Sequence, residues 1–135
     1  MNSALELHDS TLSALSQSDG AVIVVLRPAY LHMSDGLPGI DAGTGWWLDL
    51  DLRFPAASVE GMPSAFPVEI VDGSLEVGQQ KHRNVIPLPL PPATAVELVL
   101  LLETGGRLVI RGPEVVPEPR REPQYVEQFA GGRRG

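Results

Sequence analysis

The chain has 135 residues, no cysteine, and a net charge of −7 from seventeen acidic and ten basic residues. A domain of this length buries roughly two-thirds of the surface that its unfolded chain exposes, so it needs no disulfide or metal to hold a core. The lack of cysteine excludes disulfides, thiolate metal sites and a cysteine nucleophile, and it fits a reducing compartment, which predicts a cytoplasmic protein.

The charge is uneven, because thirteen of the acids but only five of the bases lie in residues 1–110. Nucleic acids and anionic membranes are bound mainly through clustered Lys and Arg, so an acidic body predicts neither as a partner. A basic protein partner stays open. The first residues lack the basic head and long apolar run of a signal peptide, and no apolar run is long enough to cross a membrane.

In chain order, the first signal is the alternation of apolar and polar residues at 4–8, which has the period of a half-buried strand. Residues 10–17 fit a second strand or a short helix. We favour a strand, because Asp19-Gly20 between two apolar runs is typical of a hairpin. Ala21–Leu26 is apolar without alternation, which predicts a central strand.

A glycine-rich loop at 34–45 is followed by WWLDLDLRF, the most regular strand pattern in the chain. Its alternation directs Trp46, Leu48, Leu50, Leu52 and Phe54 to one face and Trp47, Asp49, Asp51 and Arg53 to the other. Farther on, VEIV-DG-SLEV at 68–77 predicts a two-residue hairpin that sets Glu69 opposite Glu76. Like charges so placed would draw a basic group, for which Lys81 and Arg83 are candidates.

The densest apolar run lies at 95–111, where Gly105-Gly106 predicts a second hairpin. A three-residue loop at 104–106 would pair Glu103 with Arg107 and require a positive φ at Gly106. One face would then carry Leu98, Leu100, Leu102, Leu108 and Ile110. The other face is half apolar, which predicts that something covers part of it.

Prolines limit the segments around and after this hairpin. Residues 85–92 fit an edge strand or polyproline segment, and Glu114–Val116 fits a short edge strand. Residues 125–129 fit either a strand or a helical turn. A strand would bury Glu127 between Tyr125 and Phe129 and require a partner such as Arg27, Arg53, His8 or Arg111. The pattern predicts one all-β domain at 1–130, an antiparallel sandwich or partly open barrel of about eight or nine strands, and a flexible tail at 131–135.

The segment LELHDSTL at 5–12 and the segment YVEQF at 125–129 carry a resemblance. Together they resemble small uncharacterised bacterial proteins with an LHDS-type start and a YVE-x-F end. Short His-Asp motifs of this kind also occur in some toxin-immunity families. The resemblance implies a bacterial origin and a single domain, and it carries no catalytic role over to any residue.

His8-Asp9-Ser10 contains the residue types of a hydrolase triad, but neighbours in an extended chain point to opposite faces and cannot line up as one. His8 or Asp9 acting with distant residues stays open. A structural role is the favoured reading, in which Asp9 and Ser10 bond the backbone of a turn or bulge. Trp47, Asp49 and Asp51 form the second candidate, because an aromatic ring among exposed acids is typical of a binding surface.

The sequence contains no motif for phosphate, dinucleotide or zinc binding, so we expect no cofactor and no metal. We expect a non-catalytic binding or protein-interaction module, with His8, Asp9, Trp47, Asp49 and Asp51 as candidate binding residues. The alternative is a small hydrolase-type or cation-dependent enzyme built around His8 and Asp9. The first partner that we expect is a second copy of the chain, in a homodimer formed by pairing of an edge strand with its symmetry mate. The second is a basic protein docked on the acidic face around Trp47, Asp49 and Asp51.

Overall fold

The computed structural model describes residues 1–131, and within them the chain forms twelve strands and no helix. The all-β prediction is confirmed, although the strands outnumber the eight or nine expected. All pairs are antiparallel, and the sheet does not close into a barrel. The strands are β1 (Asn2–Glu6), β2 (Thr11–Ser18), β3 (Ala21–Ser34), β4 (Gly43–Phe54), β5 (Ser58–Glu60), β6 (Val68–Val77), β7 (Gln80–Arg83), β8 (Val85–Leu88), β9 (Val96–Leu102), β10 (Arg107–Gly112), β11 (Val116–Pro119) and β12 (Gln124–Phe129).

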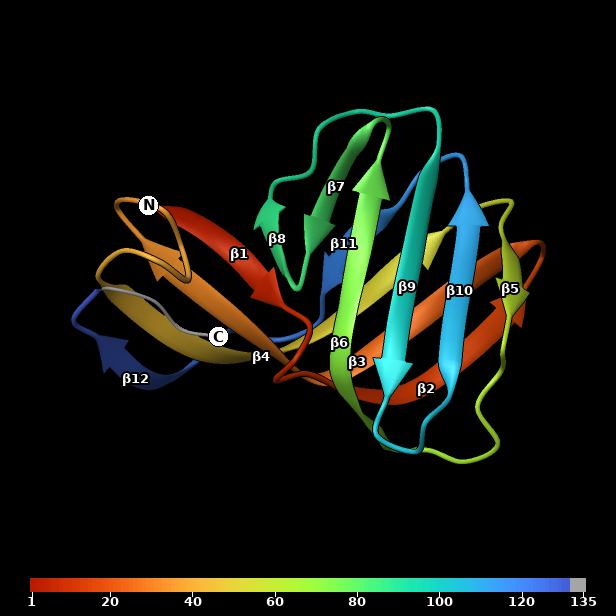
Figure 1. Ribbon diagram of the computed structural model, residues 1–135, viewed down its shortest axis with the longest axis horizontal. Helices are drawn as coiled ribbons and strands as arrows, with labels where there is room; N and C mark the ends of the chain where they lie inside the picture. The colour runs from red at the N-terminus through yellow and green to blue at the C-terminus, as the bar shows by residue number, and fades with distance from the viewer. Residues whose placement is uncertain (132–135) are drawn as a thin grey trace.

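Two layers enclose the core. Figure 1 shows β7, β6, β9, β10 and β5, here called the front sheet, crossing in front of β2, β3, β4 and β11, the back sheet. Strand β6 links the layers, because its first residues pair with β2 and its later residues pair with β9. Buried residues of both layers form one apolar cluster that includes Leu26, Leu50, Phe54, Leu98, Leu100 and Ile110.

Strands β3 and β4 are the longest, and their far halves extend beyond the front sheet. Strand β3 pairs with β2 in its first half and with β1 in its second half, and the change falls at an irregularity between Leu26 and Ala29. Strand β4 likewise pairs with β11 and then, nearer its start, with β12. The far halves of β3 and β4 with β1, β8 and β12 make the distal lobe, on the left in Figure 1.

Two local predictions from the first half of the chain are confirmed. Ser18 pairs with Ala21, and Asp19 and Gly20 between them have φ of 52° and 79°, as a tight hairpin turn requires. In β4 four of the five predicted inner side chains, Leu48, Leu50, Leu52 and Phe54, are buried, and Trp46 is half-buried. The outer side of β4 departs from expectation, since Asp51 is only 6% exposed.

The predicted hairpin at 68–77 is wrong, because β6 runs through it as one strand. Asp72-Gly73 lies next to a bulge between Ile70 and Asp72. A Cβ atom on Gly73 would lie 2.7 Å from the carbonyl oxygen of Val99, so glycine serves a close approach of two backbones there. Glu69 and Glu76 are therefore not opposed, and Glu76 lies opposite Lys81 and Glu97.

The hairpin of β9 and β10 forms with its loop one residue earlier than predicted. The turn consists of Glu103–Gly105, and the residue with the positive φ is Gly105, at 92°. The partner of Arg107 across the strands is Leu101, whereas the prediction gave Glu103. This register differs from the predicted one by two residues, which leaves every side chain on its predicted face. The inward face is confirmed, because Leu98, Leu100, Leu102, Leu108 and Ile110 are all buried.

Strand β8 is an edge strand, as predicted for residues 85–92, and residues 125–129 lie in a strand, β12. An edge strand also follows β10, but β11 begins at Val116, where the predicted strand at 114–116 ends, and includes two prolines. The carbonyl of Asn84 accepts a hydrogen bond from the backbone N–H of Leu7. The backbone polar groups of every second residue from 84 onward therefore face β1, and those of Pro87 face away from it. Arg120 donates to the carbonyl of Asp49, so Pro117 and Pro119 also face away from β4. The outer edge of β11 therefore lacks N–H donors at 117 and 119, and the outer edge of β8 keeps the N–H of Val85 but lacks one at Pro87. The predicted tail lies outside the described residues except for Gly131.

Candidate functional site

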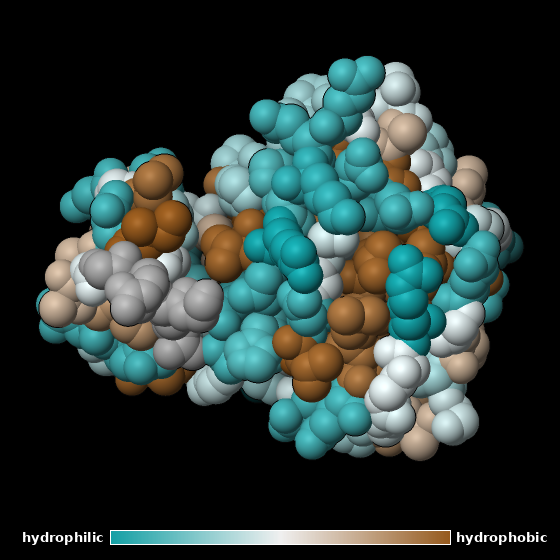
Figure 2. Space-filling model, viewed as in Figure 1, coloured by the Kyte–Doolittle hydropathy of each residue, from teal (hydrophilic) through white to brown (hydrophobic). Residues whose placement is uncertain are grey.

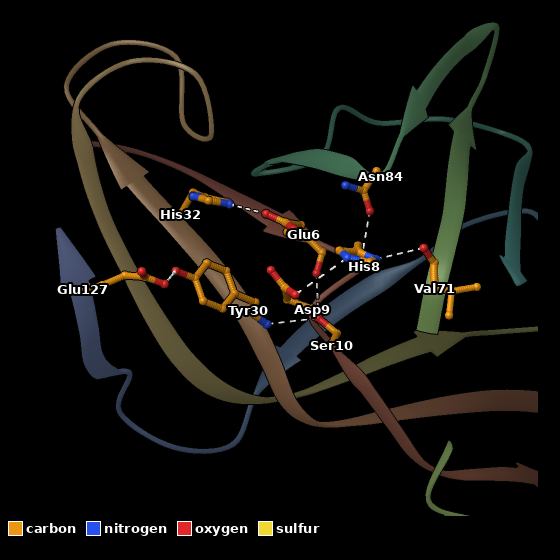
Figure 3. Close-up of polar contacts among 9 residues, drawn as sticks. All are labelled: Glu6, His8, Asp9, Ser10, Tyr30, His32, Val71, Asn84 and Glu127. Carbon is orange, nitrogen blue, oxygen red and sulfur yellow. Dashed lines mark hydrogen bonds and ion pairs between the residues drawn. The ribbon is translucent and has the colours of Figure 1, made fainter. Parts of the chain in front are cut away.

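The His8-Asp9-Ser10 corner joins β1 to β2 at the point where the distal lobe meets the sandwich (Figure 3). Ser10 is buried, and its hydroxyl donates to the carbonyl of Glu6 at 2.7 Å. The same hydroxyl accepts the backbone N–H of Tyr30 at 3.0 Å, just beyond the irregularity in β3. The expected backbone-bonding role is confirmed for Ser10, and its hydroxyl is not placed as a nucleophile.

His8 lies at the surface, with a side chain that is 54% exposed. Its Nδ1 atom lies 2.9 Å from the carbonyl oxygen of Val71, and its backbone N–H donates to the side chain of Asn84. Because a carbonyl only accepts, Nδ1 carries the proton and Nε2 is left as the basic nitrogen. Nε2 lies 4.0 Å from Asp9 Oδ1, which is longer than a hydrogen bond. This geometry fixes the ring on β6 and gives no enclosed acid–base pair.

A buried pair that the sequence did not predict lies on the neighbouring strands. Nε2 of His32 on β3 lies 2.6 Å from Oε1 of Glu6 on β1, and both side chains are 1% exposed. A carboxylate so deeply buried requires a partner of this kind. His32 Nδ1 has no hydrogen-bond partner among the described residues.

Tyr30 and Glu127 form a second contact on the same face of the distal lobe. The Tyr30 hydroxyl donates to Glu127 Oε2 at 2.5 Å, in place of the arginine or histidine partners that the sequence predicted. A bulge between Tyr125 and Glu127 turns Tyr125 to the other face, where its ring meets Trp46. The prediction that Glu127 lies between Tyr125 and Phe129 is therefore wrong.

Aromatic rings and a glycine complete this polar cluster. The ring of Phe129 lies 5.3 Å from His32, and the ring of Trp47 lies 5.0 Å from Tyr30. Opposite Glu127, Gly45 has no side chain, and a Cβ atom there would lie 1.9 Å from the Tyr30 hydroxyl. Because water is excluded from Glu6 and His32, the cluster joins β1, β3 and β12 and is not open to a substrate.

Trp47, Asp49 and Asp51 do share the outer side of β4, but the acids are already paired. Asp51 accepts from Arg120 Nε at 2.8 Å and lies 3.9 Å from Arg27, and Asp49 lies 3.2 Å from Arg121. The hydrogen bond with Asp51 raises the pKa of Arg120 above its ordinary value. The exposed acidic strip that the alternation predicted is thus paired with Arg27 on β3 and with Arg120 and Arg121 from the C-terminal part of the chain.

The outer face of the front sheet carries apolar side chains at the surface. Leu101 is 37% exposed and Val71 is 45% exposed, and Val99 beside them is half-buried. A hollow of about 250 Å³ lies here, lined by Val99, Leu101, Lys81, Arg83, Arg107 and Asp72 among others. Figure 2 shows apolar patches on this face between strongly hydrophilic side chains. The sequence predicted that part of this face is covered, and Val109 on β10 is indeed 2% exposed, whereas Leu101 on β9 is left at the surface.

A larger hollow of about 550 Å³ lies between residues 88–93 and residues 114–119.

Residues 1–131 contain no group of three His, Asp or Glu side chains arranged to hold a metal ion. In the same residues no helix is long and apolar enough to span a bilayer. Comparison of the chain with models of protein families, with curated proteins and with solved structures gave no match.

Proposed function

We propose that the protein is a non-catalytic protein-interaction module that forms a homodimer through the outer face of the front sheet. The observation that carries the proposal is the exposure of Leu101 beside Val99 in the middle of a sheet face rimmed by charged residues. Apolar patches with a polar rim are typical of protein-interaction sites. As a cysteine-free chain it would act in the cytoplasm.

The outer edges of β8 and β11 are poor alternatives for a dimer contact. Pairing of edge strands needs free N–H donors along both edges. Pro117 and Pro119 take the outward positions of β11, and Pro87 takes one of the two outward positions of β8, beside Val85. Proline has no N–H to offer a partner strand. Association through the face of the sheet needs no such donors.

The charges on the face favour a second copy of the chain as the partner. In a twofold dimer with its axis parallel to β9, β9 packs on β9 of the second copy, β6 faces β10, and β7 faces β5. A rotation about this axis keeps each residue at the same position along the strand direction. Residues that the observed register aligns across the front sheet, such as Asp72, Leu101 and Arg107, therefore face one another between the copies. Three oppositely charged pairs then meet between copies, Asp72 with Arg107, Glu76 with Arg111, and Arg83 with Glu60, while Glu97 meets Glu97 of the second copy. Within one copy Arg111 already contacts Glu97 and Glu60, and Arg83 lies 3.5 Å from Asp72, so in the dimer these arginines would be shared between acids of both copies.

A basic partner protein, as in toxin neutralisation, is the weaker proposal. It would have to displace Arg120 and Arg121 from Asp51 and Asp49 before it could use those acids. The enzyme alternative is also weaker, because His8 is exposed and Ser10 is committed to the backbone.

A charge swap between Asp72 and Arg107 tests the homodimer. Arg107→Asp alone and Asp72→Arg alone should each weaken association about tenfold or more, because each places like charges at two symmetric positions. An equimolar mixture of the two variants should associate again, since every contact of the heterodimer then joins opposite charges. Asp19→Arg, at the β2–β3 turn, is the control for net charge. A mixture that stays monomeric would overturn this interface.

A further inference from the structure

The hollow of about 550 Å³ lies away from both the front-sheet face and the His8 corner. One wall is the connection from β8 to β9, and the other wall is residues 114–119, which lead into and form β11. Figure 1 shows the β8–β9 connection arching over the top of the molecule. The volume falls within the range of small-molecule sites, which are mostly apolar with few polar groups.

The walls of this hollow are poor in hydrogen-bond donors. Five of the lining residues are prolines, which have a carbonyl but no N–H: Pro89, Pro91, Pro92, Pro117 and Pro119. The N–H groups of Leu88 and Val116 face the ladders to β1 and β4. Glu114, which is exposed, is the one ionisable side chain in the described lining. A ligand therefore meets mostly apolar surface with few N–H donors, and the carboxylate of Glu114.

We propose that this hollow binds small apolar amines, in which an ammonium group is attached to an alkyl or aryl body. The body would pack on side chains such as Leu90, Val96 and Val115. The ammonium group has three donors and no acceptor, which matches walls that offer acceptors and a negative charge. A carboxylate on the same body would meet Glu114 and few donors, and the net charge of −7 would also repel it.

Matched ten-carbon probes test the head-group preference. Decylamine, decanol and decanoate, each below its micelle concentration, are titrated into the ¹⁵N-labelled protein, and the amide signals of Val77 and Val96 are followed by NMR. Decylamine should shift these signals saturably and bind about tenfold more tightly than decanoate, with decanol between them. Ala93→Trp, which fills the hollow, should abolish the saturable shift while the rest of the spectrum is retained.

Glu114→Gln separates the local carboxylate from the overall charge. It should weaken decylamine binding about three- to fivefold, as expected for a partly exposed ion pair, and leave decanol unchanged. Glu122→Gln, which removes an equal charge away from the hollow, should have no effect. Equal binding of decylamine and decanoate, saturable binding of neither, or equal losses in the two glutamine variants would overturn the proposal.

Discussion

Nε2 of His32 lies 2.6 Å from Oε1 of Glu6, and both side chains are 1% exposed. The two residues lie on adjacent strands of the distal lobe, where Ala4 pairs with His32 and Glu6 with Tyr30. Removing one partner of a buried ion pair lowers the free energy of unfolding much more than replacing both partners by apolar residues. The contact therefore ties β1 to β3 only while both partners are present.

This relationship predicts different costs for one and two substitutions. Glu6→Leu or His32→Leu alone should lower the free energy of unfolding by about 3–5 kcal/mol, because each leaves a buried polar group without its partner. Glu6→Leu combined with His32→Leu should recover most of that loss. Urea denaturation measures all three variants, and a double variant that loses the sum of the single losses would contradict the paired burial.

Gly45 should tolerate no side chain. Gly45→Ala would place its Cβ atom 1.9 Å from the Tyr30 hydroxyl, which must then leave Glu127. We expect a loss of about 1–3 kcal/mol, as overpacking usually costs. Gly106→Ala is the matched control, since the nearest atoms to a Cβ there lie 3.8 Å away. Equal thermal shifts in the two variants would mean that Tyr30 is not confined by Gly45.

Alanine substitutions at the adjacent residues Leu100 and Leu101 of β9 should cost different amounts of stability. Leu100 is fully buried and Leu101 is 37% exposed on the outer face. Leu100→Ala should cost about 2–5 kcal/mol, as large-to-small core substitutions do. Leu101→Ala should cost clearly less stability but weaken the homodimer, because its side chain lies in the proposed interface. Denaturation of each variant at low protein concentration separates the two effects.

Alternation in the sequence predicted the strands and their buried faces well, because the side-chain period of a strand is local. The register of β9 and β10 shows why an error in the position of the predicted loop left the predicted faces correct. A shift of two residues keeps Leu100 inward and Leu101 outward, whereas a shift of one residue would have exchanged them.

The failures have physical causes that no local pattern reveals. Asp72-Gly73 has the composition of a turn, yet the backbone of β9 passes within reach of a side chain there, and only a glycine fits. The bulge in β12 separates Tyr125 from Glu127, although the alternation places them on one face. Glu6 and His32 are 26 residues apart, so their contact depends on a strand pairing that the sequence does not display.

The molecular mass of the wild-type protein in solution tests the central claim most directly. A sheet face of five strands is a small interface, so we expect a dissociation constant on the order of micromolar. Sedimentation equilibrium should show a mass that rises with protein concentration from one chain of 14.5 kDa toward two. The mass of a single chain at every concentration, with Leu101→Ala and wild type alike, would contradict the account.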